Sequence, residues 1–369
     1  MKRSFIREIL EHTTAQTISF AGGLPDESLF PLQALQEAAQ KALLEANSLQ
    51  YTTSQGYEPL RQKIAELYTA DGFATNKEEI MITSGSQQAL DIISRFYANA
   101  AITVEAPSYL GAMNVFTLNK LKQTTVVLET DGIDIDAFEK SFQTSKLAYL
   151  IPDFQNPTGT SYTQTKREKI AQIVKDTGGV LIEDSPYSLL YFTKPYRPIS
   201  EMVADQSYHL GSFSKTLAPA LRVGWIRANP KLLKELLPYK EAMDLHTNGV
   251  AQRIIYAYLQ DTQRYKKHLA TLRSAYSTKM KFFAQTLDTY LPMFEYTKPE
   301  GGMFIYGRLP QTSTSDLVQE ALQKDLVFVP GREFYTEDTN KDDEIRFNFT
   351  RSSKEEILKG IQTLRSLLK

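Results

Sequence analysis

Short apolar runs bounded by turn-forming residues alternate with amphipathic stretches through the first two thirds of the chain. This alternation is typical of an α/β fold with a wound, mostly parallel sheet between helices. Apolar residues at helical spacing predict helices at Gln87–Tyr97 and Gln164–Lys175. Seven strands are predicted, at Ile80–Thr83, Ile102–Glu105, Thr124–Leu128, Leu147–Ile151, Val180–Glu183, Tyr208–Gly211 and Arg222–Ala228.

The pattern changes after about Pro230, where helical periodicity dominates and a long charged segment, Thr262–Tyr290, predicts a helix that links two lobes. Three later strands are predicted at Met303–Tyr306, Val327–Val329 and Ile345–Phe349, with helices between and after them. We therefore expect a large α/β domain over residues 31–270 and a smaller α+β domain over residues 271–369. We expect residues 1–30 to form an arm that joins the small lobe and covers the substrate.

Composition narrows the possible functions. The 369 residues include 42 basic and 43 acidic side chains, so no strong overall charge would attract nucleic acid or an anionic membrane. The absence of cysteine excludes disulfides and thiolate chemistry, and the four histidines show no zinc-ligand spacing, so we expect no metal. Neither a signal-peptide pattern nor an apolar run of 18 residues occurs, which predicts a cytoplasmic protein that acts on small molecules.

Candidate chemistry gathers just after the predicted strands, where ligands bind in open parallel sheets. The segment Ser84–Gln88 opens a helix, and its free N–H groups and hydroxyls suit a phosphate, although an ordinary helix cap would look the same. Asn156 precedes a proline in the segment Pro152–Gly159, which could also be a plain turn. Asp184 ends an apolar strand and should therefore have a cationic partner, in a functional site or in a structural ion pair.

Lys215 follows another strand in the segment Ser212–Lys215, among small hydroxyl residues rather than on a charged helix face. Most lysines are solvated, and Lys215 on its own would be read in that way. Arg222 follows seven residues later, at the start of a strand. If that strand runs antiparallel to the others, Arg222 returns to the same edge of the sheet and can join a phosphate site.

Taken together, these motifs resemble those of class I aminotransferases of pyridoxal-phosphate fold type I. The resemblance extends from about Ile18 to Phe349, and the ordered set of motifs is far more specific than any one of them. It implies a fold type I enzyme that uses pyridoxal 5′-phosphate. The motifs that carry it are Ser84–Gln88, Gln155–Gly159, Asp184–Tyr187, Ser212–Lys215 and Arg222–Gly224.

The resemblance implies a catalytic role for several residues. Lys215 would bind the cofactor as a Schiff base and then move a proton at the substrate's Cα. Asp184 would pair with the pyridine nitrogen, while Asn156 and Tyr187 would hydrogen-bond the ring's phenolic oxygen. Tyr109 would stack on the ring, although an aromatic residue there could equally belong to the core.

The resemblance also implies how phosphate and substrate are held. Tyr51 would reach the phosphate of a neighbouring subunit, which implies a homodimer with shared active sites. Arg346, on a predicted strand, would bind the substrate's α-carboxylate or else form a structural salt bridge. Gly22 and Gly23 would let the backbone approach the substrate. The phosphate ligands implied within one chain are Ser86, Gln87, Ser212, Ser214 and Arg222.

Other segments resemble the 2-aminoadipate and kynurenine aminotransferase branch. MocR-type transcription regulators share this domain, but they carry a DNA-binding segment ahead of it, whereas here the pattern begins within 20 residues of Met1. We expect no such segment. Arg7, on a short amphipathic helix, could meet the distal carboxylate of 2-oxoglutarate or be simply solvated. The segments similar to this branch are Ile18–Asp26, Leu29–Pro31, Glu105–Tyr109, Asp244–Thr247 and Pro299–Phe304.

The predicted function is a ping-pong aminotransferase that moves an amino group from an L-amino acid to a 2-oxo acid such as 2-oxoglutarate. Aromatic, aminoadipate, branched-chain and methionine-like donors remain open. Two alternatives stand beside it. One is a β-lyase or decarboxylase on the same scaffold, because the cofactor serves several bond cleavages. The other is a non-catalytic regulatory protein that keeps the fold.

Overall fold

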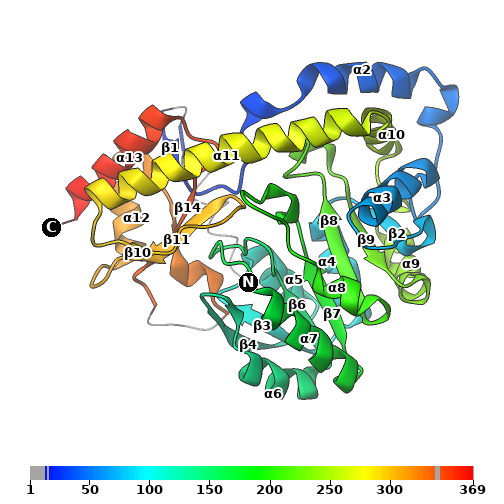
Figure 1. Cartoon of the computed structure of the whole chain (residues 1–369), viewed down its shortest axis with the longest axis horizontal. Coiled ribbons are helices and arrows are strands. Elements are labelled where there is room, and N and C mark those ends of the chain that lie inside the picture. Colours follow the sequence, from blue (N-terminus) through cyan, green and yellow to red (C-terminus); the bar gives the residue numbers. More distant parts are fainter. Residues whose placement is uncertain (1–12, 15, 337–340, 369) are drawn as a thin grey trace.

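The structure of the chain, a computed structural model, describes residues 13–14, 16–336 and 341–368. Two lobes are visible in Figure 1, and the long helix α11 (Thr262–Tyr290) runs across both of them. The described strands form an eight-stranded sheet, a four-stranded sheet and a separate two-stranded pair. The bounds of α11 agree with those predicted from the sequence.

The eight-stranded sheet confirms the predicted α/β fold. In spatial order its strands are β2 (Ile80–Thr83), β9 (Gly224–Ala228), β8 (Ser207–Ser212), β7 (Val180–Asp184), β6 (Leu147–Leu150), β3 (Ala101–Ala106), β4 (Lys122–Glu129) and β5 (Gly132–Ile133). The five strands from β8 to β4 run parallel to one another, whereas β9 runs antiparallel to both β2 and β8, which is the condition under which Arg222 returns to the same edge of the sheet.

Two details of this sheet differ from the sequence prediction. The prediction of seven strands was wrong by one, because β5 adds an eighth at the edge, antiparallel to β4. A strand of two residues is too short to show an alternating pattern. The predicted strand from Arg222 was also too long. Arg222 has a left-handed backbone with φ of 52°, so β9 begins only at Gly224.

Helices cover the large sheet, and the buried apolar side chains form three clusters, one of which continues from this sheet into the smaller lobe. The predicted helices both form, at Ser86–Phe96 and Gln164–Thr177. The helices of this lobe are α3 (Glu58–Ala70), α4 (Ser86–Phe96), α5 (Leu110–Leu118), α6 (Ile135–Ser145), α7 (Gln164–Thr177), α8 (Ile199–Met202), α9 (Pro230–Asp244) and α10 (Gly249–Leu259).

The smaller lobe contains an antiparallel sheet in the order β10 (Glu295–Tyr296), β11 (Phe304–Arg308), β14 (Glu344–Asn348) and β13 (Val329–Pro330). The predicted single strand Val327–Val329 was wrong, because the chain switches partners at Phe328. Before it, β12 (Leu326–Val327) pairs with β1 (Ile18–Ser19), and after it β13 pairs with β14. Helices α11, α12 (Thr314–Leu322) and α13 (Lys354–Leu367) accompany these strands.

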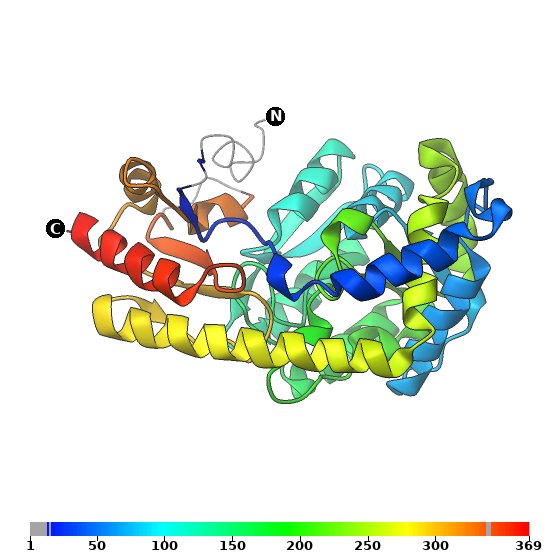
Figure 2. The same ribbon diagram turned by 90° about the horizontal axis from the view of Figure 1, so that it is seen from above.

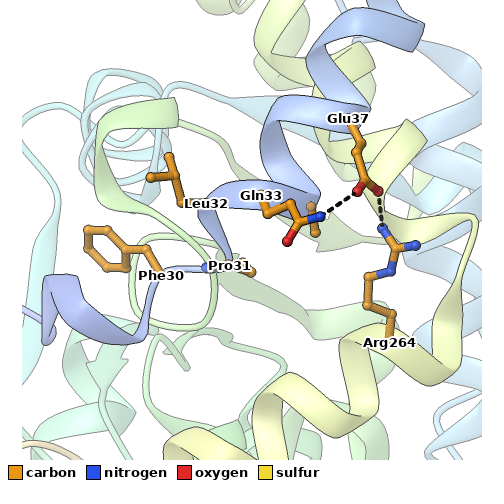
Figure 3. Close-up of a pocket in the computed structure, with 7 residues that line it drawn as sticks. Phe30, Pro31, Leu32, Gln33, Glu37 and Arg264 are labelled. Atoms are coloured by element: carbon orange, nitrogen blue, oxygen red, sulfur yellow. Dashed lines mark hydrogen bonds and ion pairs between the residues drawn. The ribbon is translucent and has the colours of Figure 1, made fainter.

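Helix α2 (Leu32–Leu43) lies along the outside of the molecule and contacts α10, as Figure 2 shows from above. Figure 3 shows a pocket at its N-terminal end, where Glu37 pairs with Arg264 of α11 at 3.4 Å and accepts a hydrogen bond from Gln33 at 3.3 Å. None of the described residues that the sequence predicts for the site lines this pocket. No helix within the described ranges is both long and apolar enough to span a membrane.

Candidate active site

The segments that follow β2 and β8 meet at one edge of the large sheet, and Arg222 joins them. Its Nη2 donates a hydrogen bond to the Ser84 carbonyl oxygen at 3.1 Å, and its Nη1 donates to Ser214 Oγ at 3.5 Å. Ser212 Oγ accepts from the Ser214 backbone N–H at 3.1 Å. The structure therefore brings together two loops rich in hydroxyls and backbone N–H groups around one guanidinium, an arrangement suited to a phosphate.

Gly85 allows this close approach. Its φ is +81°, and a Cβ atom there would lie 2.6 Å from Arg222 Nη2, so a larger residue would displace the guanidinium. Helix α4 begins directly after it at Ser86, and the unpaired N–H groups of a helix N-terminus favour an anion. Gln87 side-chain atoms contact the loop before α5, where Oε1 accepts from Tyr109 Oη at 3.3 Å. Tyr109 thus lies beside this cradle.

Asp184 lies at the end of β7 and is only 2% exposed. Its Oδ2 accepts a hydrogen bond from Tyr149 Oη at 2.8 Å, whereas its Oδ1 is buried and has no partner among the described residues. No ion pair among the described residues includes Asp184, so its expected cationic partner is not a side chain of this part of the chain. Burial raises the pKa of Asp184 to about 7, and the Tyr149 hydroxyl opposes that rise. A protonated ring nitrogen would satisfy Oδ1, since a buried unpaired acceptor is costly.

Arg346 lies on β14, is 2% exposed, and faces Asn156 from the other lobe. Its Nη1 donates to Asn156 Oδ1 at 2.8 Å, and its Nη2 donates to the Ala21 carbonyl oxygen. The guanidinium lies 4.4 Å and 4.9 Å from the ring centres of Phe304 and Phe334. Its Nε is buried without a partner, and no ion pair in the described ranges involves Arg346, which argues against a structural salt bridge.

Asn156 also contacts Tyr187, because its Nδ2 donates a hydrogen bond to Tyr187 Oη at 3.4 Å. Both side chains are buried, and Tyr187 packs edge-on against Phe304. Burial, more than any neighbouring charge, raises the pKa of Tyr187 above its usual range, so the hydroxyl stays protonated and can donate a hydrogen bond. Asn156 is therefore held between a phenol and a guanidinium.

Lys215 is partly buried between these groups, and its Nζ donates to the Gly23 carbonyl oxygen at 2.7 Å. Burial lowers the pKa of Lys215 to about 8, and the positive charges of Arg346 and Arg222 contribute to that lowering. A useful fraction of the amine is neutral near pH 8, as a nucleophile requires. Gly22 and Gly23 lie in the same segment, and a Cβ on Gly23 would lie only 3.3 Å from Phe304.

Comparisons with known proteins identify the family of the chain. The profile of the family "Aminotransferase class I and II" matches residues 17–364. The chain belongs to this aminotransferase family. It is 36% identical to the 2-aminoadipate transaminase of Thermus thermophilus, with 100% of this chain and 94% of that protein covered. It is 35% identical to the aromatic-amino-acid aminotransferase 1 of Thermococcus litoralis, with 100% and 92% covered.

A solved structure gives the same result for the fold. The α-aminoadipate aminotransferase LysN of Thermus thermophilus, complexed with N-(5′-phosphopyridoxyl)-L-leucine, superposes with a TM-score of 0.91 at 34% identity. The match covers 100% of this chain and 95% of that one. The protein is thus a fold type I aminotransferase with pyridoxal phosphate as cofactor. The cradle at Arg222 and the unpaired Asp184 Oδ1 fit the phosphate and the ring of that cofactor.

Sequence reasoning missed the role of Glu105, a fully buried carboxylate of β3 in this aminotransferase. Its Oε1 accepts from the Ile151 N–H at 2.9 Å and from Tyr162 Oη at 2.6 Å, while its Oε2 accepts from Gln155 Nε2 at 2.9 Å. Gln155 Nε2 also donates to the Pro107 carbonyl oxygen at 2.9 Å. Glu105 therefore ties the loop before Tyr109 to the loop that carries Asn156. An acidic residue inside an apolar strand was the available signal.

Tyr51 does not join the part of the site that the structure assembles within one chain. Tyr51 is 77% exposed, and its ring packs edge-on against His246 at 5.7 Å. Arg7 lies outside the described residues. No group of three potential metal ligands occurs in the described ranges either. The part of the site that the structure assembles within one chain therefore comprises the cradle, Asp184, Lys215 and the pair Asn156–Arg346.

Proposed function

We propose that this aminotransferase moves the amino group of an L-amino acid to a 2-oxo acid, with 2-oxoglutarate as the acceptor, in a ping-pong reaction. Aromatic, aminoadipate, branched-chain and methionine-like amino acids are the proposed donors. The observation that carries the proposal is Arg346, a buried guanidinium with an unpaired Nε and no carboxylate bound within the described chain. A planar guanidinium binds a carboxylate through two parallel hydrogen bonds. We propose that the substrate's α-carboxylate supplies this partner.

The proposed division of labour follows from the contacts of each side chain. Bound pyridoxal phosphate supplies an aldehyde that condenses with amines and a ring that accepts electrons from Cα. Lys215 Nζ binds the cofactor and carries the proton removed from the substrate's Cα. Asp184 Oδ1 holds the proton of the ring nitrogen, and Asn156 and Tyr187 donate hydrogen bonds to the phenolic oxygen. Tyr109 covers the ring.

The proposed phosphate ligands are spread over three segments, so each supplies one or two donors to the anion. An exposed stretch of the chain supports a homodimer in which a second copy adds Tyr51 to this group. Leu44, Leu49 and Tyr51 are 83%, 75% and 77% exposed, which is unusual for large apolar side chains so close together. The proposed ligands within one chain are Ser86, Gln87, Ser212, Ser214 and Arg222.

Gly22 and Gly23 are proposed to lie against the bound substrate, because the segment that contains them is held by both Lys215 and Arg346 through its carbonyl oxygens. The contact of Arg7 with a distal carboxylate stays a prediction. So do the division into residues 1–30, 31–270 and 271–369, the cytoplasmic location, and the expected absence of nucleic-acid and metal partners.

The test is a donor panel with the cofactor-loaded protein. With aromatic, branched-chain, methionine and 2-aminoadipate donors plus 2-oxoglutarate, we expect L-glutamate to form. With a donor alone, we expect one equivalent of 2-oxo acid per subunit and no ammonia or CO₂, which separates amino transfer from lyase and decarboxylase chemistry. Lys215→Ala is the control without turnover. Release of ammonia or CO₂ in place of L-glutamate would contradict the proposal.

A further inference from the structure

The two carboxylate oxygens of Asp184 have different surroundings. Strands β6 and β7 are parallel neighbours in which Tyr149 pairs with Ile182, so Tyr149 and Asp184 lie on the same face of the sheet, two residues apart in register. The Tyr149 hydroxyl reaches Asp184 Oδ2 at 2.8 Å. Asp184 Oδ1 has no partner among the described residues. One oxygen is thus fixed by the protein, and the other remains open for a ligand.

Packing fixes the position of Tyr149 itself. The residue is fully buried, and its ring packs edge-on against Phe116 of α5 with 5.2 Å between the ring centres. It belongs to the large apolar cluster that lies along the sheet. A buried aromatic ring in such a cluster has little freedom to rotate. The packing therefore fixes the position of the hydroxyl, and in that position the hydroxyl donates its hydrogen bond to Asp184.

The electrostatic surroundings make this hydrogen bond important. Three titratable groups lie close enough to Asp184 for its charge to raise the pKa of each, namely Glu105 on β3, Tyr149 on β6 and Tyr187 after β7. Burial raises the pKa of Asp184 to about 7, and the Tyr149 hydroxyl is the group that opposes this rise. Burial and the nearby carboxylates raise the pKa of Tyr149 far above its usual value, so the hydroxyl remains a donor.

We propose that Tyr149 is a positioning residue of this aminotransferase, which holds Asp184 through Oδ2 and thereby leaves Oδ1 available to the ring nitrogen of the cofactor. The inference rests on the proposed role of Asp184. Tyr149 does not contact the reacting atoms. It acts through Asp184, by fixing the direction of the carboxylate and by stabilising its ionised form with a hydrogen bond.

The test is a double-mutant cycle of Tyr149→Phe and Asp184→Asn in the loaded enzyme. Two quantities are measured: the dissociation constant of pyridoxal phosphate by equilibrium dialysis, and the single-turnover rate with an amino donor. We expect Tyr149→Phe alone to slow the turnover about tenfold, the effect of losing one hydrogen bond to a charged group, and to weaken cofactor binding about threefold. In the Asp184→Asn background it should change either quantity less than about twofold.

The pH dependence provides a second readout. Loss of the hydroxyl raises the carboxyl pKa, so a smaller fraction of Asp184 is ionised at a given pH, and the acid limb of the rate profile moves to higher pH. Tyr258→Phe is the matched control. Tyr258 is also buried, in another apolar cluster, and its hydroxyl has no partner in the described chain, so its removal should leave the rate and the pH profile unchanged.

The outcomes separate this inference from the proposed function. If Asp184→Asn is damaging but Tyr149→Phe costs the same factor in both backgrounds, Tyr149 has only a structural effect and the inference is wrong. If Asp184→Asn leaves both quantities unchanged, the role of Asp184 fails and the inference fails with it. If the Tyr149→Phe variant shows no cooperative melting transition and is therefore not folded, Tyr149→Met is measured in its place.

Discussion

The two ends of the active site differ in their exposure to solvent. At the phosphate end, the side chains of Gln87 and Arg222 are exposed. At the other end, Asp184, Tyr149 and Arg346 are almost completely buried. The exposed end is also the end that we propose a second copy of the chain to complete, through Tyr51. The buried end is assembled from two lobes of a single chain.

The difference in exposure corresponds to two different ways of binding an anion. Charges exposed to water are screened, so an exposed anion site needs several donors, and each donor contributes only modestly to the binding free energy. A buried charge without a partner is costly, and a ligand that supplies the missing partner removes that cost. The buried end should therefore respond sharply to single substitutions, and the phosphate end should respond mildly and depend on salt.

The largest effect is expected for Arg346→Lys at the buried end. A lysine keeps the charge but loses the planar pair of donors and the contacts with the faces of Phe304 and Phe334. We expect KM for the amino donor to rise about 100-fold. Steady-state kinetics would measure it. Arg351→Lys is the control, because Arg351 is exposed and, among the described residues, its side chain forms an ion pair only with Glu27, at 3.4 Å. A rise similar to that of the control would contradict the carboxylate role.

A smaller effect is expected for Arg222→Gln at the phosphate end. Loss of one exposed charge among several donors should weaken binding of pyridoxal phosphate about tenfold. The loss should shrink as salt is raised from about 0.05 to about 0.5 M, because the contact in the unsubstituted enzyme is screened. Equilibrium dialysis measures both values. If the loss of cofactor affinity does not depend on salt, the guanidinium binds the phosphate away from solvent, which would contradict the exposed character of this end.

The pH dependence of cofactor loading tests the site between the two ends. Because the pKa of Lys215 is lowered to about 8, its amine is an ammonium group below that pH and is neutral above it. The rate at which the apoenzyme takes up pyridoxal phosphate should rise about tenfold per pH unit up to about 8 and then level off. Free Nα-acetyl-lysine is the control, and its rate should keep rising past about pH 9. An enzyme rate that follows this control would contradict the lowered pKa.

The smallest effect is expected for Glu105→Gln. This substitution changes the hydrogen bonds that hold two loops of the site together, and it does not change a residue that contacts the cofactor or the substrate. The new amide would point an N–H group at Gln155 or Tyr162, each of which now donates to the carboxylate. We expect the free energy of unfolding to fall by about 1 kcal/mol, which urea denaturation measures. Glu66→Gln, on the exposed face of α3, is the control. An unchanged midpoint would mean that Glu105 does not hold the two loops together.

Sequence motifs singled out individual residues of the site but did not predict the contacts between them, and the reason is the range of those contacts. Lys215, Asp184 and Asn156 each stand in short motifs after a strand, and the strands themselves follow from local apolar runs. The contact between Arg346 and Asn156 joins residues 190 positions apart, and that between Tyr149 and Asp184 depends on the register of two strands. Neither arrangement leaves a local pattern.

The errors in the prediction of the fold have similar physical causes. The strand β5 has two residues, too few for a period-two pattern, and the apolar run around Phe328 gave no sign that it serves two different partners. Arg222 was placed in a strand because the residues after it are apolar, whereas its backbone turns to a positive φ just before β9. That turn is what directs its side chain to Ser84 and Ser214.

The account depends most on Lys215 as the residue that binds the cofactor. Its most direct test is borohydride reduction of the loaded protein, followed by mass-spectrometric peptide mapping. We expect one reduced phosphopyridoxyl adduct per subunit, on Lys215, and none in Lys215→Ala. An adduct on another lysine, or no adduct in cofactor-saturated protein, would contradict the account.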